Sequence, residues 1–157
     1  MSVTEAVVGK TVLITGASRG IGAAAARIFA DAGANVALAA RNGDAIAEIA
    51  GEIGNQAVAI PCDVSRYWEV EAAVSACQKA FGGPDILIGN AGVIEPLSHL
   101  DAIHPEEWGK VIDIHPKRVF NGLRAAIPVI KQPSSATIIP LAPAASNTPP
   151  RRTRTPT

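Results

Sequence analysis

The sequence predicts an α/β domain of the Rossmann type, a doubly wound parallel sheet that is truncated after about four or five strands. Three observations predict it. Short apolar runs alternate with segments of helical periodicity between residues 8 and 132. Glycines follow most of these segments, where strands turn and helices end. A loop with three glycines joins the first strand to the first helix. This order is typical of βαβ units with right-handed crossovers.

The elements follow in order along the chain. We expect strands at 11–15, 35–40, 57–61 and 85–88. We expect helices at 20–32, at 44–53, from Ser65 to about residue 81, and over 105–132. In the second helix, Ile46, Ile49, Ala50 and Ile53 form one apolar face. Ser65 is expected to cap the third helix, and Pro105 to be the first residue of the fourth.

Composition bounds the class of protein. The chain has 157 residues, no net charge, 48% hydrophobic residues and two cysteines. These values favour one soluble domain. The cysteines, Cys62 and Cys77, fit neither a disulfide framework nor a metal site and are interpreted as buried apolar residues. No apolar run is long enough to span a membrane, and residues 1–10 do not resemble a signal peptide. We therefore expect a cytoplasmic protein with no metal and no membrane partner.

The C-terminal part differs in composition. Residues 114–157 carry seven basic residues and no acidic one, whereas all 14 acidic residues precede them. Within residues 133–157, Thr137 to Leu141 is a possible fifth strand, although Pro140 lacks the N–H that a central strand donates. The Pro-, Ser-, Thr- and Arg-rich remainder predicts a disordered tail. Its three arginines have no aromatic residues between them, so we expect no nucleic-acid partner.

The strongest motif is TGASRGIG, residues 15–22, between the first strand and the first helix. A dinucleotide pyrophosphate needs backbone N–H donors at a helix N-terminus and no side chain in the way. This motif resembles the glycine loop of the short-chain dehydrogenase/reductase family. Three further stretches are similar to that family: CDV at 62–64, NAG at 90–92, and EEWGKVIDI with VFNGLRAAIPV on the last helix. The resemblance covers residues 8–132, the expected partial NAD(P)-binding domain.

The resemblance implies hydride transfer between a nicotinamide cofactor and a carbonyl or alcohol substrate. It also implies the cofactor-binding residues. Asp63 and the Val64 backbone would meet the adenine, and Asn90, Ala91 and Gly92 would lie along the ribose. The pyrophosphate and the adjacent ribose would be held by Gly16, Ser18, Arg19, Gly20, Ile21 and Gly22.

The end of the second strand indicates which cofactor is preferred. An acidic residue there would bind the ribose hydroxyls and repel a 2′-phosphate. This chain instead has Ala40, followed by Arg41 and Asn42, and Arg19 adds a second guanidinium. Because arginines bind phosphate by charge-assisted hydrogen bonds, we expect NADP rather than NAD. The alternative is that both arginines are solvated surface residues.

The family's catalytic Ser, Tyr and Lys have no counterparts here. The single tyrosine, Tyr67, has Glu71 four residues on, and it lies far upstream of the family's position. Pro143 occupies the serine position, and His115, before Pro116, replaces the asparagine of the long helix. No catalytic residue is therefore assigned, and the chain is predicted to be inactive.

Two function hypotheses follow. The chain is either a truncated member of an NADP-dependent oxidoreductase family or a non-catalytic NADP(H)-binding module. In both, its partner is a nicotinamide dinucleotide. Family members generally associate through the long helix and the one after it, so a homo-oligomer through residues 105–132 is possible.

Overall fold

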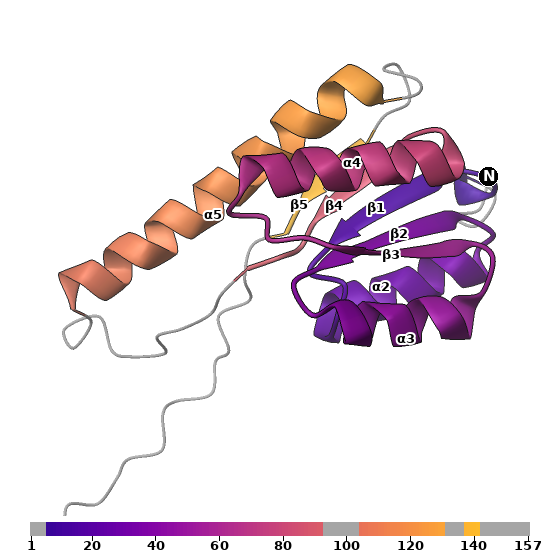
Figure 1. The fold of residues 1–157 in the computed structure, drawn as a ribbon, viewed down its shortest axis with the longest axis horizontal. Coiled ribbons are helices and arrows are strands. Elements are labelled where there is room, and N and C mark those ends of the chain that lie inside the picture. Colours follow the sequence, from indigo (N-terminus) through magenta and orange to yellow (C-terminus); the bar gives the residue numbers. More distant parts are fainter. Residues whose placement is uncertain (1–5, 93–103, 131–136, 142–157) are drawn as a thin grey trace, which may run out of the picture.

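The computed structural model describes residues 6–92, 104–130 and 137–141. Five parallel strands form one sheet in the order β3-β2-β1-β4-β5 (Figure 1). The strands are β1 (Thr11–Thr15), β2 (Asn35–Ala40), β3 (Ala57–Pro61), β4 (Ile86–Gly89) and β5 (Thr137–Pro140). The helices are α2 (Gly20–Asp31), α3 (Gly43–Ile53), α4 (Tyr67–Phe81) and α5 (Pro105–Ala126), and a 3-10 turn, η2 (Ile127–Val129), follows α5. The doubly wound α/β fold is confirmed.

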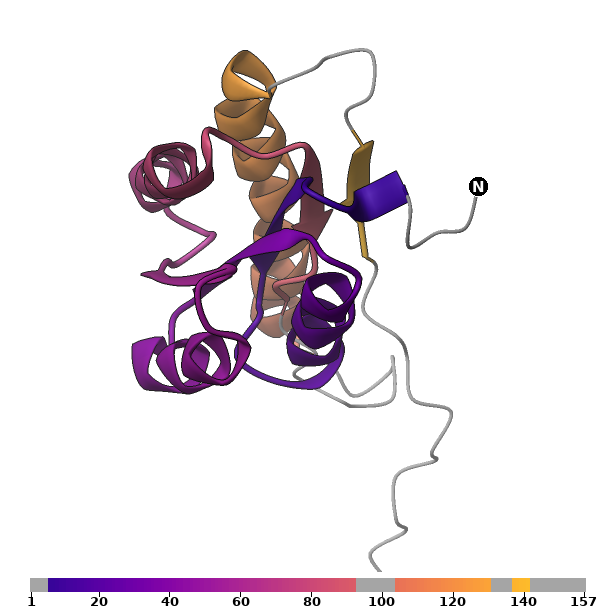
Figure 2. The ribbon, with the colours of Figure 1, turned by 90° about the vertical axis from the view of Figure 1, so that its right-hand side faces the viewer.

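Helices cover both faces of the sheet. Figure 2 shows α2 and α3 on one face and α4 and α5 on the other. Alternate residues of each strand supply the two cores, because successive side chains of a strand point to opposite faces. On β1, Val12 and Ile14 pack with α2 and α3, whereas Leu13 packs with α4 and α5.

The strand order changes direction between β1 and β4. From β1 the chain proceeds outward to β2 and β3, then crosses back to β4 on the other side of β1 and continues to β5. At such a switch point the loops after the two central strands diverge and leave a crevice at their carboxyl ends. The glycine loop follows β1 and the segment 90–92 follows β4, so both predicted ligand-binding stretches meet at this crevice.

The possible fifth strand is present as β5. It pairs with β4 in parallel, with Ile86 opposite Thr137 and Gly89 opposite Pro140. The N–H groups of Thr137 and Leu141 donate to carbonyl oxygens on the β4 side. Pro140 lies between such donors, so its missing N–H would point away from β4. Proline is tolerated there because β5 is an edge strand in the described part of the chain. The tail expected after Leu141 lies outside the described residues.

Several element boundaries differ from those expected. Helix α3 begins at Gly43 rather than residue 44, β4 covers 86–89 rather than 85–88, and α4 begins at Tyr67. Ser65 does not cap α4: the N-cap position is Arg66, and no side-chain cap bond is made there. Pro105 begins α5 as predicted, and α5 continues through Pro116 to Ala126.

Candidate functional site: the carboxyl edge at the switch point

The two loops at the switch point are tied together by Asn90 and Thr15. The Asn90 amide nitrogen Nδ2 donates to the Thr15 carbonyl oxygen at 3.1 Å and to the Gly16 carbonyl oxygen at 3.0 Å. The Thr15 hydroxyl oxygen accepts from the backbone N–H groups of Asn90 and Ala91, both at 3.1 Å, and donates to Ile88. These bonds fix the glycine loop against the start of the 90–92 segment. They also engage both N–H donors of the Asn90 side chain.

At Gly16 and Gly22 the glycine loop is packed too closely for any other residue type. A Cβ atom on Gly22 would lie 2.3 Å from the Gly16 carbonyl oxygen and 2.6 Å from Asn90 Nδ2. Gly16 has a φ of +67°, and a Cβ atom on it would lie 2.7 Å from the Ala91 Cα. Helix α2 therefore begins directly against the loop, and the loop against the 90–92 segment.

The N-terminus of α2 follows the glycine loop at the switch point and has no side-chain cap among the described residues. Its N-cap residue, Arg19, is in an extended conformation, and the first turn contains no acidic residue. Gly20 has open space where a Cβ would be. Ser18 is half-buried, whereas Arg19 and Ile21 are exposed. A helix start with free N–H donors and a positive dipole end is a site for an anion.

The end of β2 lies beside this site. Ala40 is buried, and the two residues after it are exposed. Asn42 is the N-cap of α3: its side-chain oxygen Oδ1 accepts a hydrogen bond from the Ala45 N–H at 3.1 Å. Arg41 makes no ion pair among the described residues, but its charge acts on the Asp63 carboxylate. Arg41 is thus the cationic side chain exposed at the end of β2.

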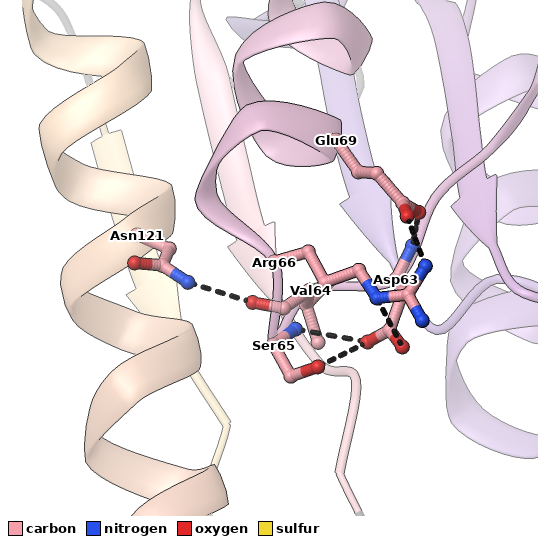
Figure 3. A network of polar contacts seen from close by, with 6 residues as sticks. All are labelled: Asp63, Val64, Ser65, Arg66, Glu69 and Asn121. Carbon is pink, nitrogen blue, oxygen red and sulfur yellow. Dashed lines mark hydrogen bonds and ion pairs between the residues drawn. The ribbon is translucent and has the colours of Figure 1, made fainter.

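After β3, Asp63 lies at the centre of a polar network (Figure 3). Its carboxylate oxygen Oδ1 accepts from the Ser65 N–H at 3.0 Å and from the Ser65 hydroxyl at 2.8 Å. Its backbone N–H donates to Glu69 Oε2 at 2.7 Å, and Glu69 Oε1 accepts from Arg66 at 2.9 Å. Ser65 therefore binds Asp63 instead of capping α4, which explains why the predicted cap is wrong.

The two carboxylates of this network are stabilised as anions. Partial burial disfavours the charge on Asp63, but hydrogen bonds from Ser65 and the nearby Arg41 and Arg66 outweigh it, so the pKa of Asp63 lies below its usual value. The pKa of Glu69 is lowered first by the hydrogen bond from the Asp63 N–H and then by Arg66. At neutral pH the turn after β3 holds two negative charges beside Arg66.

Four residues that sequence reasoning did not select support these loops: Thr15, Glu69, Arg118 and Asn121. Asn121 of α5 donates through Nδ2 to the Val64 carbonyl oxygen at 3.0 Å, so α5 holds the turn after β3 (Figure 3). Arg118 of α5 donates to the carbonyl oxygens of Asn90 and Leu141. Both α5 side chains are buried. The sequence does hold a signal for these two residues, because a polar residue on the apolar face of a predicted helix needs a buried partner.

Other residues considered from the sequence lie as follows. Tyr67 begins α4, with the Arg124 guanidinium 5.1 Å from the centre of its ring. Cys62 and Cys77 are buried, as predicted, and neither forms a disulfide with the other; burial raises the pKa of Cys62 to about 11. The backbone at His115 is helical. Pro143 lies outside the described residues.

Among the described residues, no group of three or more His, Cys, Asp or Glu is arranged to hold a metal ion. The same part of the chain contains no helix with the length and apolarity that a membrane crossing requires.

Comparison with known families matches residues 10–153 to the short chain dehydrogenase family. Among curated proteins, the chain is 37% identical over 139 residues to an uncharacterized oxidoreductase of Staphylococcus saprophyticus, covering 88% of this chain and 56% of that one. It is 43% identical over 123 residues to 3beta-hydroxysteroid dehydrogenase 1 of Eggerthella lenta, covering 76% of this chain and 47% of that one.

Two solved structures are similar in fold and sequence. A 3-ketoacyl-(acyl-carrier-protein) reductase from Brucella melitensis, complexed with NADH, has a TM-score of 0.73 and 37% identity and covers 78% of this chain and 50% of its own. A short-chain dehydrogenase/reductase of the glucose/ribitol dehydrogenase type from the same organism has a TM-score of 0.79 and 28% identity, with 87% and 57% covered. The chain thus spans about half the length of the proteins it matches.

Proposed function

The chain belongs to the short-chain dehydrogenase family, and from this premise we propose that it binds NADP(H) at the carboxyl edge of the sheet, across the β1–β4 switch point. One observation carries the proposal: the uncapped start of α2 lies against a loop in which Gly16 and Gly22 leave no room for a Cβ atom, while the space at Gly20 is open. Free N–H donors, a helix dipole and a close backbone approach are what a pyrophosphate requires.

The other parts of the dinucleotide would contact loops at the same carboxyl edge of the sheet. The pyrophosphate and its adjacent ribose would lie on the residues from Gly16 to Gly22, including Ser18, Arg19, Gly20 and Ile21. The adenosine half would lie over the ends of β2 and β3, with Asp63 and Val64 at the adenine. The nicotinamide half would lie on the other side of the switch point, along Asn90, Ala91 and Gly92.

We propose NADP(H) over NAD(H) because of the end of β2. A buried Ala40 stands where an acidic residue would bind free ribose hydroxyls, and exposed Arg41 follows it. Arg19 supplies a second exposed guanidinium from the start of α2. A 2′-phosphate there would gain charge-assisted hydrogen bonds from arginine. The Asn42 side chain already caps α3, so we expect Asn42 to act indirectly, by holding the turn that carries Arg41 in place.

The test is a fluorescence titration of NADPH and NADH into the purified chain. We expect saturable binding that is tighter for NADPH. Arg41→Asp should weaken NADPH by at least about tenfold, because it replaces an attraction for the 2′-phosphate with a repulsion. Lys79→Asp makes the same charge change in the last turn of α4, away from the carboxyl edge of the sheet, and should leave both titrations unchanged. Equal affinity of the parent chain for NADPH and NADH would overturn the cofactor preference.

We further propose that these 157 residues do not by themselves turn over a carbonyl substrate. The supporting observation is Tyr67, which starts α4 beside Glu71 rather than beside a lysine; its hydroxyl lies 3.5 Å from Glu71 Oε1. Tyr67 therefore does not form the pair of a tyrosine with a lysine four residues on that family members use for acid/base catalysis. A truncated family member and a non-catalytic NADP(H)-binding module both predict this outcome.

The measurement is the rate of NADPH oxidation with a panel of small aldehydes and ketones, in the parent chain and in Arg41→Asp. We expect no rate above background in either. A rate that falls in Arg41→Asp would contradict the proposal, because a contaminating enzyme would not respond to a substitution in this chain.

A further inference from the structure

Arg118 of α5 carries a buried charge that has no ionic partner among the described residues. Only 7% of the residue is exposed. Its Nε atom is buried and has no hydrogen-bond partner within the part of the chain that the structure describes, and burial lowers the pKa of the guanidinium. Buried cations are usually paired, and an unsatisfied buried donor needs an explanation. The two carbonyl oxygens that the guanidinium contacts suggest what the charge does.

The guanidinium of Arg118 bridges the carboxyl ends of two strands. Nη2 donates to the Leu141 carbonyl oxygen at 2.8 Å, directly after β5. Nη1 makes a longer contact of 3.5 Å with the Asn90 carbonyl oxygen, directly after β4. Asn90 in turn holds the glycine loop through its side chain. A single α5 side chain therefore connects the end of β5 to the 90–92 segment and, through Asn90, to the loop after β1.

These contacts lie on one side of the switch point only. Arg118 contacts residues after β4 and β5, whereas the turns after β2 and β3 are held by other groups, Asn42 and Glu69. In a doubly wound domain the two halves of a dinucleotide lie on opposite sides of the switch point, with the adenosine half over β2. Arg118 is therefore placed to influence the nicotinamide half and not the adenosine half.

We propose that Arg118 is a positioning residue that sets the 90–92 segment for the nicotinamide half of the dinucleotide. The inference rests on the proposed NADP(H) binding and deepens it. Arg118 acts through Asn90, by fixing the direction of the chain where it leaves β4.

A methionine at position 118 separates this role from folding. Arg118 lines a small cavity of about 20 Å³ whose other walls, including Leu87, Val119 and Ile138, are largely apolar. Methionine keeps an unbranched apolar side chain at this position and removes a buried charge that burial disfavours. Arg118→Met should therefore still fold, while losing both carbonyl contacts.

The experiment compares two ligands by calorimetry in the full chain: NADPH, which has both halves, and 2′,5′-ADP, which has only the adenosine half. We expect Arg118→Met to bind NADPH about tenfold more weakly and 2′,5′-ADP with unchanged affinity, the loss being that of a charged hydrogen bond. Arg118→Lys, which keeps one donor, should recover part of the NADPH affinity. Arg124→Met, which removes an exposed arginine from the same helix, is the matched control and should change neither ligand.

Each result decides between the proposals. Unchanged NADPH affinity in Arg118→Met would overturn the positioning role. Equal loss of both ligands would also overturn it, because the effect would then be on the whole fold. Failure of the parent chain to bind either ligand would instead overturn the proposed function itself.

Discussion

Gly22 shows how one residue fixes the distance between the glycine loop and α2. A Cβ atom there would lie 2.3 Å from the Gly16 carbonyl oxygen, and it would also meet the Asn90 amide that ties the two loops together. Neither neighbour can yield easily, since one is backbone and the other makes two hydrogen bonds. A methyl group at this position must therefore displace the whole loop.

We predict that Gly22→Ala lowers the free energy of unfolding by about 1–3 kcal/mol, the usual cost of overpacking, and abolishes NADPH binding. Gly51→Ala is the matched control. Gly51 lies exposed in α3 with no atom within 4 Å of its Cβ position, so alanine there should stabilise the chain by about 0.5–1 kcal/mol. Urea unfolding measures both changes. If the two variants unfold at the same urea concentration, the close approach at Gly22 does not hold in solution.

At the scale of elements, the strands were predictable almost to the residue and the helix starts less so. The β-rich apolar runs at 11–15, 35–40 and 57–61 were expected as strands, and the structure has strands with these limits. The start of α4 was misjudged because Ser65 has a competing partner. Its hydroxyl and N–H both bind Asp63, and Glu69 of the first helical turn reaches back to the Asp63 N–H. Local propensity cannot rank two such partners for one side chain.

The supporting side chains of α5 were unpredictable for a different reason. Helical periodicity shows which face of α5 is buried, but not which distant backbone groups that face meets. Asn121 bonds to a residue 57 positions earlier, and Arg118 to residues 28 positions earlier and 23 positions later. The glycine loop was recognisable because its chemistry is local, with a strand, the glycines and a helix start in one stretch. The residues that hold the loop in place are far from it in the sequence, so they were not recognisable in this way.

Large apolar side chains are exposed on both helical faces of the molecule. On the face formed by α4 and α5, Phe120 is 56% exposed and Ile127, in the turn after α5, is 60% exposed. On the opposite face, Ile21 and Ile28 of α2 are exposed. Exposed apolar residues are normal on a monomer, so exposure alone does not select an interface, and the family resemblance selects the α5 side.

We therefore predict that the chain self-associates through α5, as the resemblance suggested for residues 105–132. Phe120→Glu should shift the sedimentation coefficient toward that of a monomer, because a charge at the centre of an apolar contact must lose its water. The helix itself should tolerate the change, since Arg124 is one turn further and already lies 5.9 Å from the Phe120 ring. Ile28→Glu, the same kind of change on the opposite face, is the control and should leave association intact. Association that survives Phe120→Glu but is lost in Ile28→Glu would place the interface on the α2 side and contradict the prediction.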